Sequence, residues 1–295
     1  MFRSLRVKKL PETVPLKPGG LPFEKLGEDK AYPISLNQLN SLPEFTRQRI
    51  FRCLLPLELL VRFNIDPLSW KGEDGSELVH LDVNAERGIV RVSAQASSEP
   101  QDDFFHLELS DNAYSGIDLN FIILSDPTGQ RFGTDIDGQG NPTWFGTARR
   151  NLQEEQRAMQ AGLAPGQTRR GLGSSRQVFQ QLEVFLAVLG HRSYFLEPLS
   201  YVSAWLFERM GFAYTRGHKL MDDINREFQP GGKLHDALDD SSPFRQGDQW
   251  QSVRGRAWAI QDGILEAFDA HWDKLRMIKH IGKHAGVETY PGSTY

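Results

Sequence analysis

Hydrophobic and polar positions change their period along this chain. Residues 36–63 carry apolar side chains at helical spacing with a break at Pro56, whereas the first 33 residues hold too many prolines and glycines for regular structure and form an extended arm. From residue 77 the period falls to two, as in strands with one buried face. Short polar segments suited to hairpins separate four such runs, at 77–83, 88–94, 104–109 and 117–124. The sequence therefore predicts a four-stranded antiparallel meander.

Beyond the fourth run, helical and strand-like patterns alternate. Residues 125–167 are polar and rich in glycine, with one candidate helix at 148–161, and we expect a lid or loop there. A helix at 174–189, a strand at 194–196, a helix at 200–210 and a strand at 212–215 follow. Gly190 and Gly211 stand where the two helices should end. The pattern as a whole predicts an α/β fold.

The last part of the chain shows apolar positions that step by three or four, which predicts one long helix over 250–278. Such a stripe must be buried, either against the central domain or against a second copy of the chain in a homodimer. We divide the chain into an N-terminal arm with helices (1–75), a central domain (76–217), and a C-terminal linker with the long helix (218–295). The stripe consists of Trp250, Val253, Ala257, Ile260, Ile264, Phe268, Trp272, Leu275 and Ile278.

Composition narrows the class of protein. The 295 residues are 39% hydrophobic, and no apolar run reaches the ~18 residues of a membrane-spanning helix, so we expect a soluble protein that does not enter membranes. The net charge of −4 argues against a dedicated nucleic-acid binder. The only cysteine, Cys53, has no internal disulfide partner, which favours a reducing compartment, the cytoplasm.

The strongest local signal is the segment Thr-Arg-Arg-Gly-Leu-Gly-Ser-Ser at 168–175, directly before a predicted helix. Two glycines allow a sharp turn, and the unpaired amides of a helix start attract anions. The segment therefore predicts a phosphate-binding loop. The alternative is an ordinary glycine turn in which Ser174 or Ser175 caps the helix.

Together with the helix and strand that follow it, this loop resembles the GNAT superfamily of N-acetyltransferases. The family's phosphate loop usually reads Gln/Arg-x-x-Gly-x-Gly/Ala, which Gly171 and Gly173 match. A later helix and strand carry the matching residues Leu206, Gly211 and Phe212.

Several features depart from the family pattern. Thr168 replaces Gln or Arg, and about 43 residues separate the fourth strand from the loop. In the later helix Ser200 replaces Asn, Ser203 replaces Ala and Phe207 replaces Tyr. The family's two helices between the first and second strands are absent there, unless those at 36–63 take their role.

The resemblance implies a GNAT-like mixed, largely antiparallel sheet flanked by helices, here with N- and C-terminal extensions. It implies an acyl-CoA-dependent N-acyltransferase that uses acetyl-CoA or another acyl-CoA, with pantetheine between the fourth and fifth strands. The acceptor would be a small-molecule or exposed primary amine that attacks the thioester directly. The alternative is a non-catalytic GNAT-fold protein that binds CoA or another phosphate ligand.

Candidate site residues follow from the loop, the strands and the second helix. Glu108 and Asp118 lie on central strands and are the candidate bases, although alternate strand positions are also commonly polar where one face meets water. An amide at Ile123 or Leu124 would stabilise the oxyanion. Ser200, Ser203 and Phe207 share one helical stripe that we expect to face the cofactor, without an acid for the leaving thiolate. The expected cofactor-binding set is Ile123, Leu124, Arg169, Arg170, Gly171, Leu172, Gly173, Ser174, Ser175, Ser200, Ser203 and Phe207.

Other candidate sites are weaker, and we expect no metal. Residues 135–140 resemble the start of a calcium loop, but Gly146 stands where a glutamate is needed. His280 and His284 would share one face of a helix, as a zinc-binding pair can, but Gly282 and the lysines nearby favour a solvated helix end. Between residues 99 and 137 there are nine carboxylates and one arginine, which could attract a cationic amine or form a solvated acidic surface.

Overall fold

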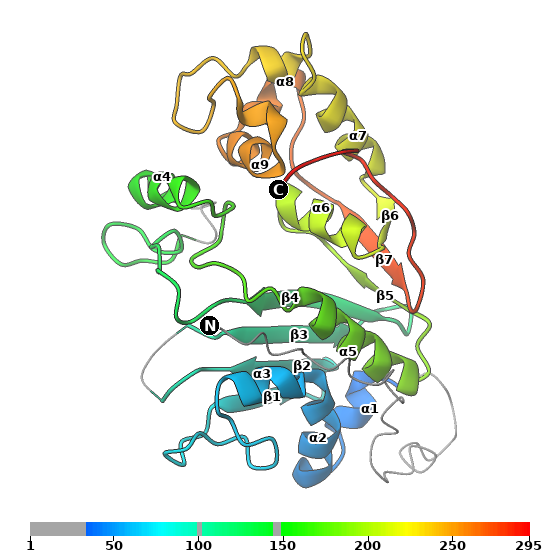
Figure 1. Ribbon diagram of the computed structural model, residues 1–295. Coiled ribbons are helices and arrows are strands. Elements are labelled where there is room, and N and C mark those ends of the chain that lie inside the picture. Colours follow the sequence, from blue (N-terminus) through cyan, green and yellow to red (C-terminus); the bar gives the residue numbers. More distant parts are fainter. Residues whose placement is uncertain (1–33, 99–101, 144–148) are drawn as a thin grey trace, which may run out of the picture.

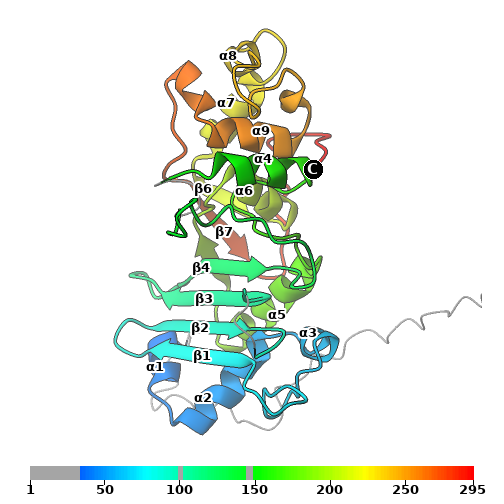
Figure 2. The same ribbon diagram turned by 90° about the vertical axis from the view of Figure 1, so that its left-hand side faces the viewer.

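The computed structural model describes residues 34–98, 102–143 and 149–295 (Figures 1 and 2). It has an α/β fold built on a seven-stranded, mostly antiparallel sheet with the order β1-β2-β3-β4-β5-β7-β6. Only the β4–β5 pair is parallel. The strands are β1 (Val79–Asn84), β2 (Ile89–Ala94), β3 (Phe105–Asp111), β4 (Ile117–Leu124), β5 (Ser193–Leu196), β6 (Ala213–Arg216) and β7 (Arg276–His280).

The helices predicted within 36–63, 148–161, 174–189 and 200–210 form, with shorter spans than the apolar pattern suggested. Pro43 and Pro56 stand directly before helices, where proline costs no backbone hydrogen bond. Gly190 and Gly211 follow the ends of α5 and α6 with φ of +86° each, the left-handed conformation that glycine adopts without strain. The α-helices are α1 (Leu36–Asn40), α2 (Glu44–Phe51), α3 (Leu57–Arg62), α4 (Leu152–Gln160), α5 (Ser175–Val188), α6 (Tyr201–Arg209), α7 (His218–Glu227), α8 (Lys233–Asp236) and α9 (Val253–Gln261).

The prediction of one long helix over 250–278 was wrong. Helix α9 ends at Gln261, Gly263 turns the chain with φ of +84°, and a short 3-10 helix (Ile264–Phe268) follows. Arg276–His280 is then strand β7, which lies between β5 and β6. The segment 218–295, for which the sequence predicts a linker and a helix, thus supplies an inner strand of the sheet.

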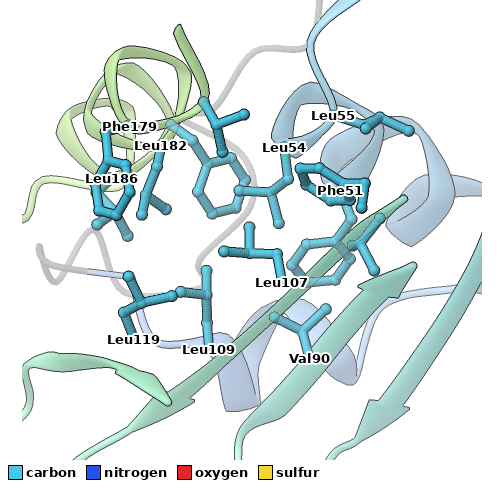
Figure 3. Packing of buried hydrophobic residues seen from close by; sticks show 14 of the residues in the cluster. Phe51, Leu54, Leu55, Val90, Leu107, Leu109, Leu119, Phe179, Leu182 and Leu186 are labelled. Atoms are coloured by element: carbon cyan, nitrogen blue, oxygen red, sulfur yellow. The ribbon is translucent and has the colours of Figure 1, made fainter. Parts of the chain in front are cut away.

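Helices α1–α3 and α5 cover one face of the sheet (Figure 3). Alternate strand residues such as Val90, Leu107, Leu109 and Leu119 point into this cluster, as the period-two pattern requires. The helices contribute Phe51, Leu54, Leu55, Phe179, Leu182 and Leu186.

The opposite face of β1–β4 carries polar side chains. Arg91 on β2 bridges Asp82 on β1 and Glu108 on β3, and these side chains stay partly exposed. Figure 2 shows these four strands side by side below α4 and α9. One face of the sheet therefore packs against the core, and the other presents polar side chains that a ligand could contact.

A second cluster joins α6–α9 at the far end of the molecule from α1–α3 (Figure 1). The predicted apolar stripe is buried here, since Val253, Ala257 and Ile264 are at most 3% exposed. The stripe is thus covered within one chain and needs no second copy. A third, smaller cluster links the 125–167 insertion to this end of the molecule through Phe132, Ala158, Leu163, Phe244 and Trp258.

Within the described residues, no helix combines the length and the apolar character needed to cross a bilayer.

His191 makes the acid stability of this fold testable. Its ring is 7% exposed, Nε2 lies 3.0 Å from the Ile34 carbonyl oxygen, and burial lowers its pKa. The unfolded chain therefore takes up a proton below about pH 6.5 where the folded chain resists it, so stability falls as the pH drops through that value. We expect the melting temperature to fall less between pH 7.5 and 5.5 in His191→Gln than in wild type. His80→Gln, on exposed strand β1, is the control, and identical pH dependence in all three proteins would contradict the prediction.

Candidate functional site

The sheet opens between β4 and β5. The two strands pair only where residues 117–119 of β4 meet residues 194–196 of β5, although β4 continues to Leu124. A bulge at Asn120 shifts the β3–β4 register at the same point, because Glu108 pairs with Phe121 whereas Leu109 pairs with Leu119. No described strand pairs with the β5-side edge of residues 120–124, so the sheet is open along this edge, which we call the opening.

Backbone direction decides which amides face this opening. The Leu124 carbonyl accepts a hydrogen bond from the Leu172 amide at 3.2 Å, on the edge away from β3. Successive residues of a strand point their N–H and C=O groups to opposite edges, so Ile122 shares this edge and Ile123 points toward β3. Of the two expected oxyanion donors, Leu124 therefore faces the opening and Ile123 does not. Ile122 joins Leu124 there, and strand alternation would have identified it once one of the contacts was known.

The glycine loop lies against the end of β4. Asp126 donates from its amide to the Arg170 carbonyl at 2.8 Å, and Ser125 forms a β-bridge with Gly171. A Cβ on Gly171 would lie 3.4 Å from the Leu124 carbonyl oxygen, whereas Gly173 needs its glycine for a φ of +72°. The 125–167 insertion therefore leaves the sheet and returns to the same point. The long separation of strand and loop in sequence does not separate them in space.

Helix α5 begins without a side-chain cap. Ser174 occupies the N-cap position, but its hydroxyl lies near the Leu172 carbonyl at 3.5 Å and does not bond to the first-turn amides. The amides of Ser175, Arg176 and Gln177 have no hydrogen-bond partner in the described part of the chain. The capping role that we had considered for Ser174 is therefore absent. The helix start keeps the free donors and the positive dipole end that bind anions.

The loop arginines differ in their roles. Arg169 is 16% exposed, and its guanidinium is turned inward, where it bonds to Asp102 at 3.2 Å and to the carbonyls of Pro127 and Gly129. Hydrogen bonds from Arg131 and Arg169 lower the pKa of Asp102. Arg169 thus holds the loop, and its side chain is not free for the ligand that we expected it to bind.

Three other arginines surround the loop with side chains in solvent. Arg170 and Arg176 are exposed, and Arg170 donates to the Ala161 carbonyl at 3.3 Å. Arg62 at the end of α3 donates to the Leu172 carbonyl at 3.3 Å and was not predicted from the sequence. These cations leave the loop in a positive environment, which suits a phosphate ligand.

Ser200 and Ser203 do not form a cofactor-facing stripe. Ser200 is the N-cap of α6, and the two serines bond reciprocally, each hydroxyl to the other's amide, at 2.9 and 3.2 Å. The Phe207 ring packs 5.9 Å from that of Phe179 and 5.3 Å from that of Phe212, which fixes α6 against α5. The expected stripe therefore serves capping and packing, a role that the Ser-x-x-Ser pattern at a helix start could have indicated.

The two candidate bases are both held by arginine. Glu108 accepts from Arg91 Nε and from Asn120 Nδ2, the latter at 3.0 Å. Asp118 accepts from Arg276 Nη2 at 2.8 and 2.9 Å and from Asn112 Nδ2 at 2.8 Å. Each carboxylate is about one-fifth exposed and lies on the polar face. Glu108 accepts two of these hydrogen bonds and Asp118 accepts three, so part of the acceptor capacity of each carboxylate is already occupied.

The metal motifs considered above serve local structure. Asp137 accepts the amides of Gln139 and Asn141 at 2.9 Å, which forms a turn, and Asp135 pairs with Arg131. His280 lies in β7 and His284 in the turn after it, so the two share no helical face. Gly146 lies outside the described residues. Among the residues described, no group of three His, Cys, Asp or Glu side chains could hold a metal ion.

The described part of the insertion is anchored to the C-terminal end of the molecule. Arg150 pairs with Glu155 and with Asp262, and Trp258 Nε1 donates to the Leu163 carbonyl at 2.9 Å. Asp262 also pairs with Arg245 at 2.9 Å. The insertion thus connects the glycine loop to α9.

No protein-family model matches this sequence, and no match was found among curated proteins or among solved structures.

Proposed function

We propose that this protein is a GNAT-like N-acyltransferase that takes its acyl group from acetyl-CoA or another acyl-CoA. The observation that carries the proposal is the opening between β4 and β5 with the glycine loop against its end. The resemblance implies pantetheine between the fourth and fifth strands and phosphates on the loop. In support of this, the end of β4 and the glycine loop are in contact, although 43 residues of sequence separate them.

Backbone groups would bind most of the donor substrate. The phosphates bind the free amides of Ser175, Arg176 and Gln177, with support from the exposed arginines. The Leu124 amide N–H and the Ile122 peptide group bind pantetheine as a strand partner would, while the Leu124 carbonyl stays bonded to the Leu172 amide. An amide on this edge polarises the thioester carbonyl. These backbone contacts to the donor substrate would not require the burial of any charged side chain.

The transfer itself would be a direct displacement. The amine nitrogen bonds to the carbonyl carbon, the carbon–sulfur bond breaks, and the thiolate leaves with the electron pair. The amine nitrogen gives up its proton to a base on the polar face, where Glu108 and Asp118 are the two carboxylates that the sequence offers. The thiolate needs no acid near neutral pH, since a thiol of pKa about 8.5 is a tolerable leaving group, and Phe207 supplies none.

Two observations favour a second candidate function, that of a GNAT-fold protein which binds CoA or another phosphate ligand without catalysis. Both candidate bases are engaged by arginines, and Phe207 lies in an aromatic cluster. The anion-binding loop is common to both functions. Turnover distinguishes them.

The decisive test pairs calorimetry with a thiol-release assay. We expect CoA to bind with a dissociation constant in the micromolar range and acetyl-CoA to release thiol faster when a primary amine is present. The amine panel includes spermidine, tyramine, glycinamide and kanamycin. CoA binding without amine-dependent release from any of them would favour the non-catalytic function. No binding of CoA would refute the acyltransferase function and leave, of the second function, only the binding of another phosphate ligand.

A further inference from the structure

A histidine lies on the polar face of β3, the strand that pairs with the other edge of β4. His106 is on β3 and pairs in register with Ile123 of β4, next to Ile122, whose peptide faces the opening. The His106 side chain is 22% exposed. It points to the face opposite the α1–α3 and α5 core, because its neighbours Phe105 and Leu107 are buried in that core. An acceptor that approached β4 over the polar face would meet this ring.

The ring is oriented by a carboxylate that is itself held in place. His106 Nδ1 lies 3.3 Å from Asp103 Oδ2, and Gln95 Nε2 donates to Asp103 Oδ1 at 3.2 Å. The Phe121 ring meets the imidazole edge-on at 5.7 Å between centroids. Nε2 of His106 has no hydrogen-bond partner among the described residues. A carboxylate on Nδ1 with a free Nε2 is the arrangement in which imidazole accepts a proton at Nε2.

The two carboxylates predicted as bases differ from His106 in this respect. Each already accepts hydrogen bonds from a guanidinium and an amide. These donors occupy part of the hydrogen-bonding capacity of each carboxylate. His106 Nε2 has no such partner among the described residues, and the carboxylate on Nδ1 supports the role that we assign to the ring.

We propose that His106 is the proton acceptor of the transfer reaction, with Asp103 and Gln95 as positioning residues; this rests on the proposed acyltransferase function. The amine lone pair bonds to the thioester carbonyl carbon, and the nitrogen's proton passes to His106 Nε2, directly or through one water. The carbon–sulfur bond breaks, and the thiolate leaves with its electron pair. Asp103 stabilises the imidazolium that forms, which later returns its proton to solvent.

The experiment compares His106→Ala, His106→Gln and the control His80→Ala, a histidine on exposed strand β1. Thiol release from acetyl-CoA is followed with whichever amine of the panel above the wild type uses fastest. We expect kcat to fall about 10²-fold or more in both His106 variants, with calorimetric CoA affinity unchanged. Added imidazole should restore part of the activity of His106→Ala only. His80→Ala should behave as wild type.

The positioning role of Asp103 has its own readout. Asp103→Asn should lower kcat in the wild-type background and have no further effect in His106→Ala, because a residue that acts through His106 has nothing to act on once the ring is gone. A merely structural role would lower kcat in both backgrounds.

The outcomes separate this inference from the proposed function. A wild type that acetylates an amine while His106→Ala and His106→Gln keep its rate would refute the role of His106 and leave the acyltransferase proposal intact. Loss of activity without imidazole rescue, together with an effect of Asp103→Asn in both backgrounds, would also refute it. A wild type that binds CoA but acetylates no amine would overturn both.

Discussion

Replacing Gly173 by valine should weaken CoA binding at least 30-fold. Gly173 has a φ of +72°, a conformation that costs a β-branched residue about 1 to 3 kcal/mol. The loop would relieve this strain by moving the amides at the start of α5, so the ligand loses contacts in addition to the strain energy. Calorimetric titration with CoA measures the effect, and a thermal melt shows whether the domain stays folded.

Gly231→Val is a matched control for this substitution. Gly231 has a φ of +87° and, like Gly173, open space where a Cβ would lie, but it precedes α8 at the far end of the molecule. The control should lose comparable stability and keep wild-type CoA affinity. If both variants bind CoA equally well, the loop is not the phosphate site.

Arg169→Leu should weaken CoA binding about 30-fold even though the side chain faces away from the proposed ligand. The substitution removes the contacts to Asp102 and to the Pro127 and Gly129 carbonyls. Buried polar groups that lose a partner cost about 2 kcal/mol, and 1.4 kcal/mol corresponds to a tenfold change in affinity. The lost binding free energy is the part that had kept the loop in its CoA-binding conformation.

Salt separates this role from a direct charge contact. The loss in Arg169→Leu should persist in high salt, since the side chain is mostly buried. Arg176→Leu removes an exposed cation, so its smaller loss should shrink as salt screens the charge. If the Arg169→Leu deficit disappeared with salt as well, Arg169 would be a phosphate ligand and not an anchor.

Much of the sheet could be predicted from the sequence because strands joined by hairpins show their period-two pattern and their turns within one short segment. The predicted span of β4 matches the observed strand, and β1–β3 differ by one or two residues at their ends. Strand β7 was missed because Leu275 and Ile278, three positions apart, fit a helical period. Met277 and Lys279 are the buried positions of this strand. The Lys279 ammonium group donates to the Lys283 carbonyl at 2.6 Å, and its ionic partner is Glu183 on α5, at 3.5 Å. No local pattern contains that partner.

The candidate site divides in the same way. The loop and the start of α5 were predictable, since glycines directly before a helix have a local meaning. The partners of Arg169 and Asp118 were not, because Asp102 and Arg276 meet them only across the fold. His106 did leave a local signal: Asp103 lies three residues before it, and a histidine at an outward strand position is worth examining for an oriented base.

The position of β7 determines the order in which the two edges of β5 can pair while the chain is synthesised. Glu197 follows β5 directly, yet 79 positions separate it from Arg276 at the start of β7. On a growing chain β5 can pair with β4 early, but its other edge stays bare until all of α7–α9 has been made. Such an edge invites pairing with other chains, and closure over so long a separation is slow. During synthesis, β5 therefore lines the proposed active site while its other edge is unpaired and open to pairing with other chains. A chaperone would be of most use at that stage.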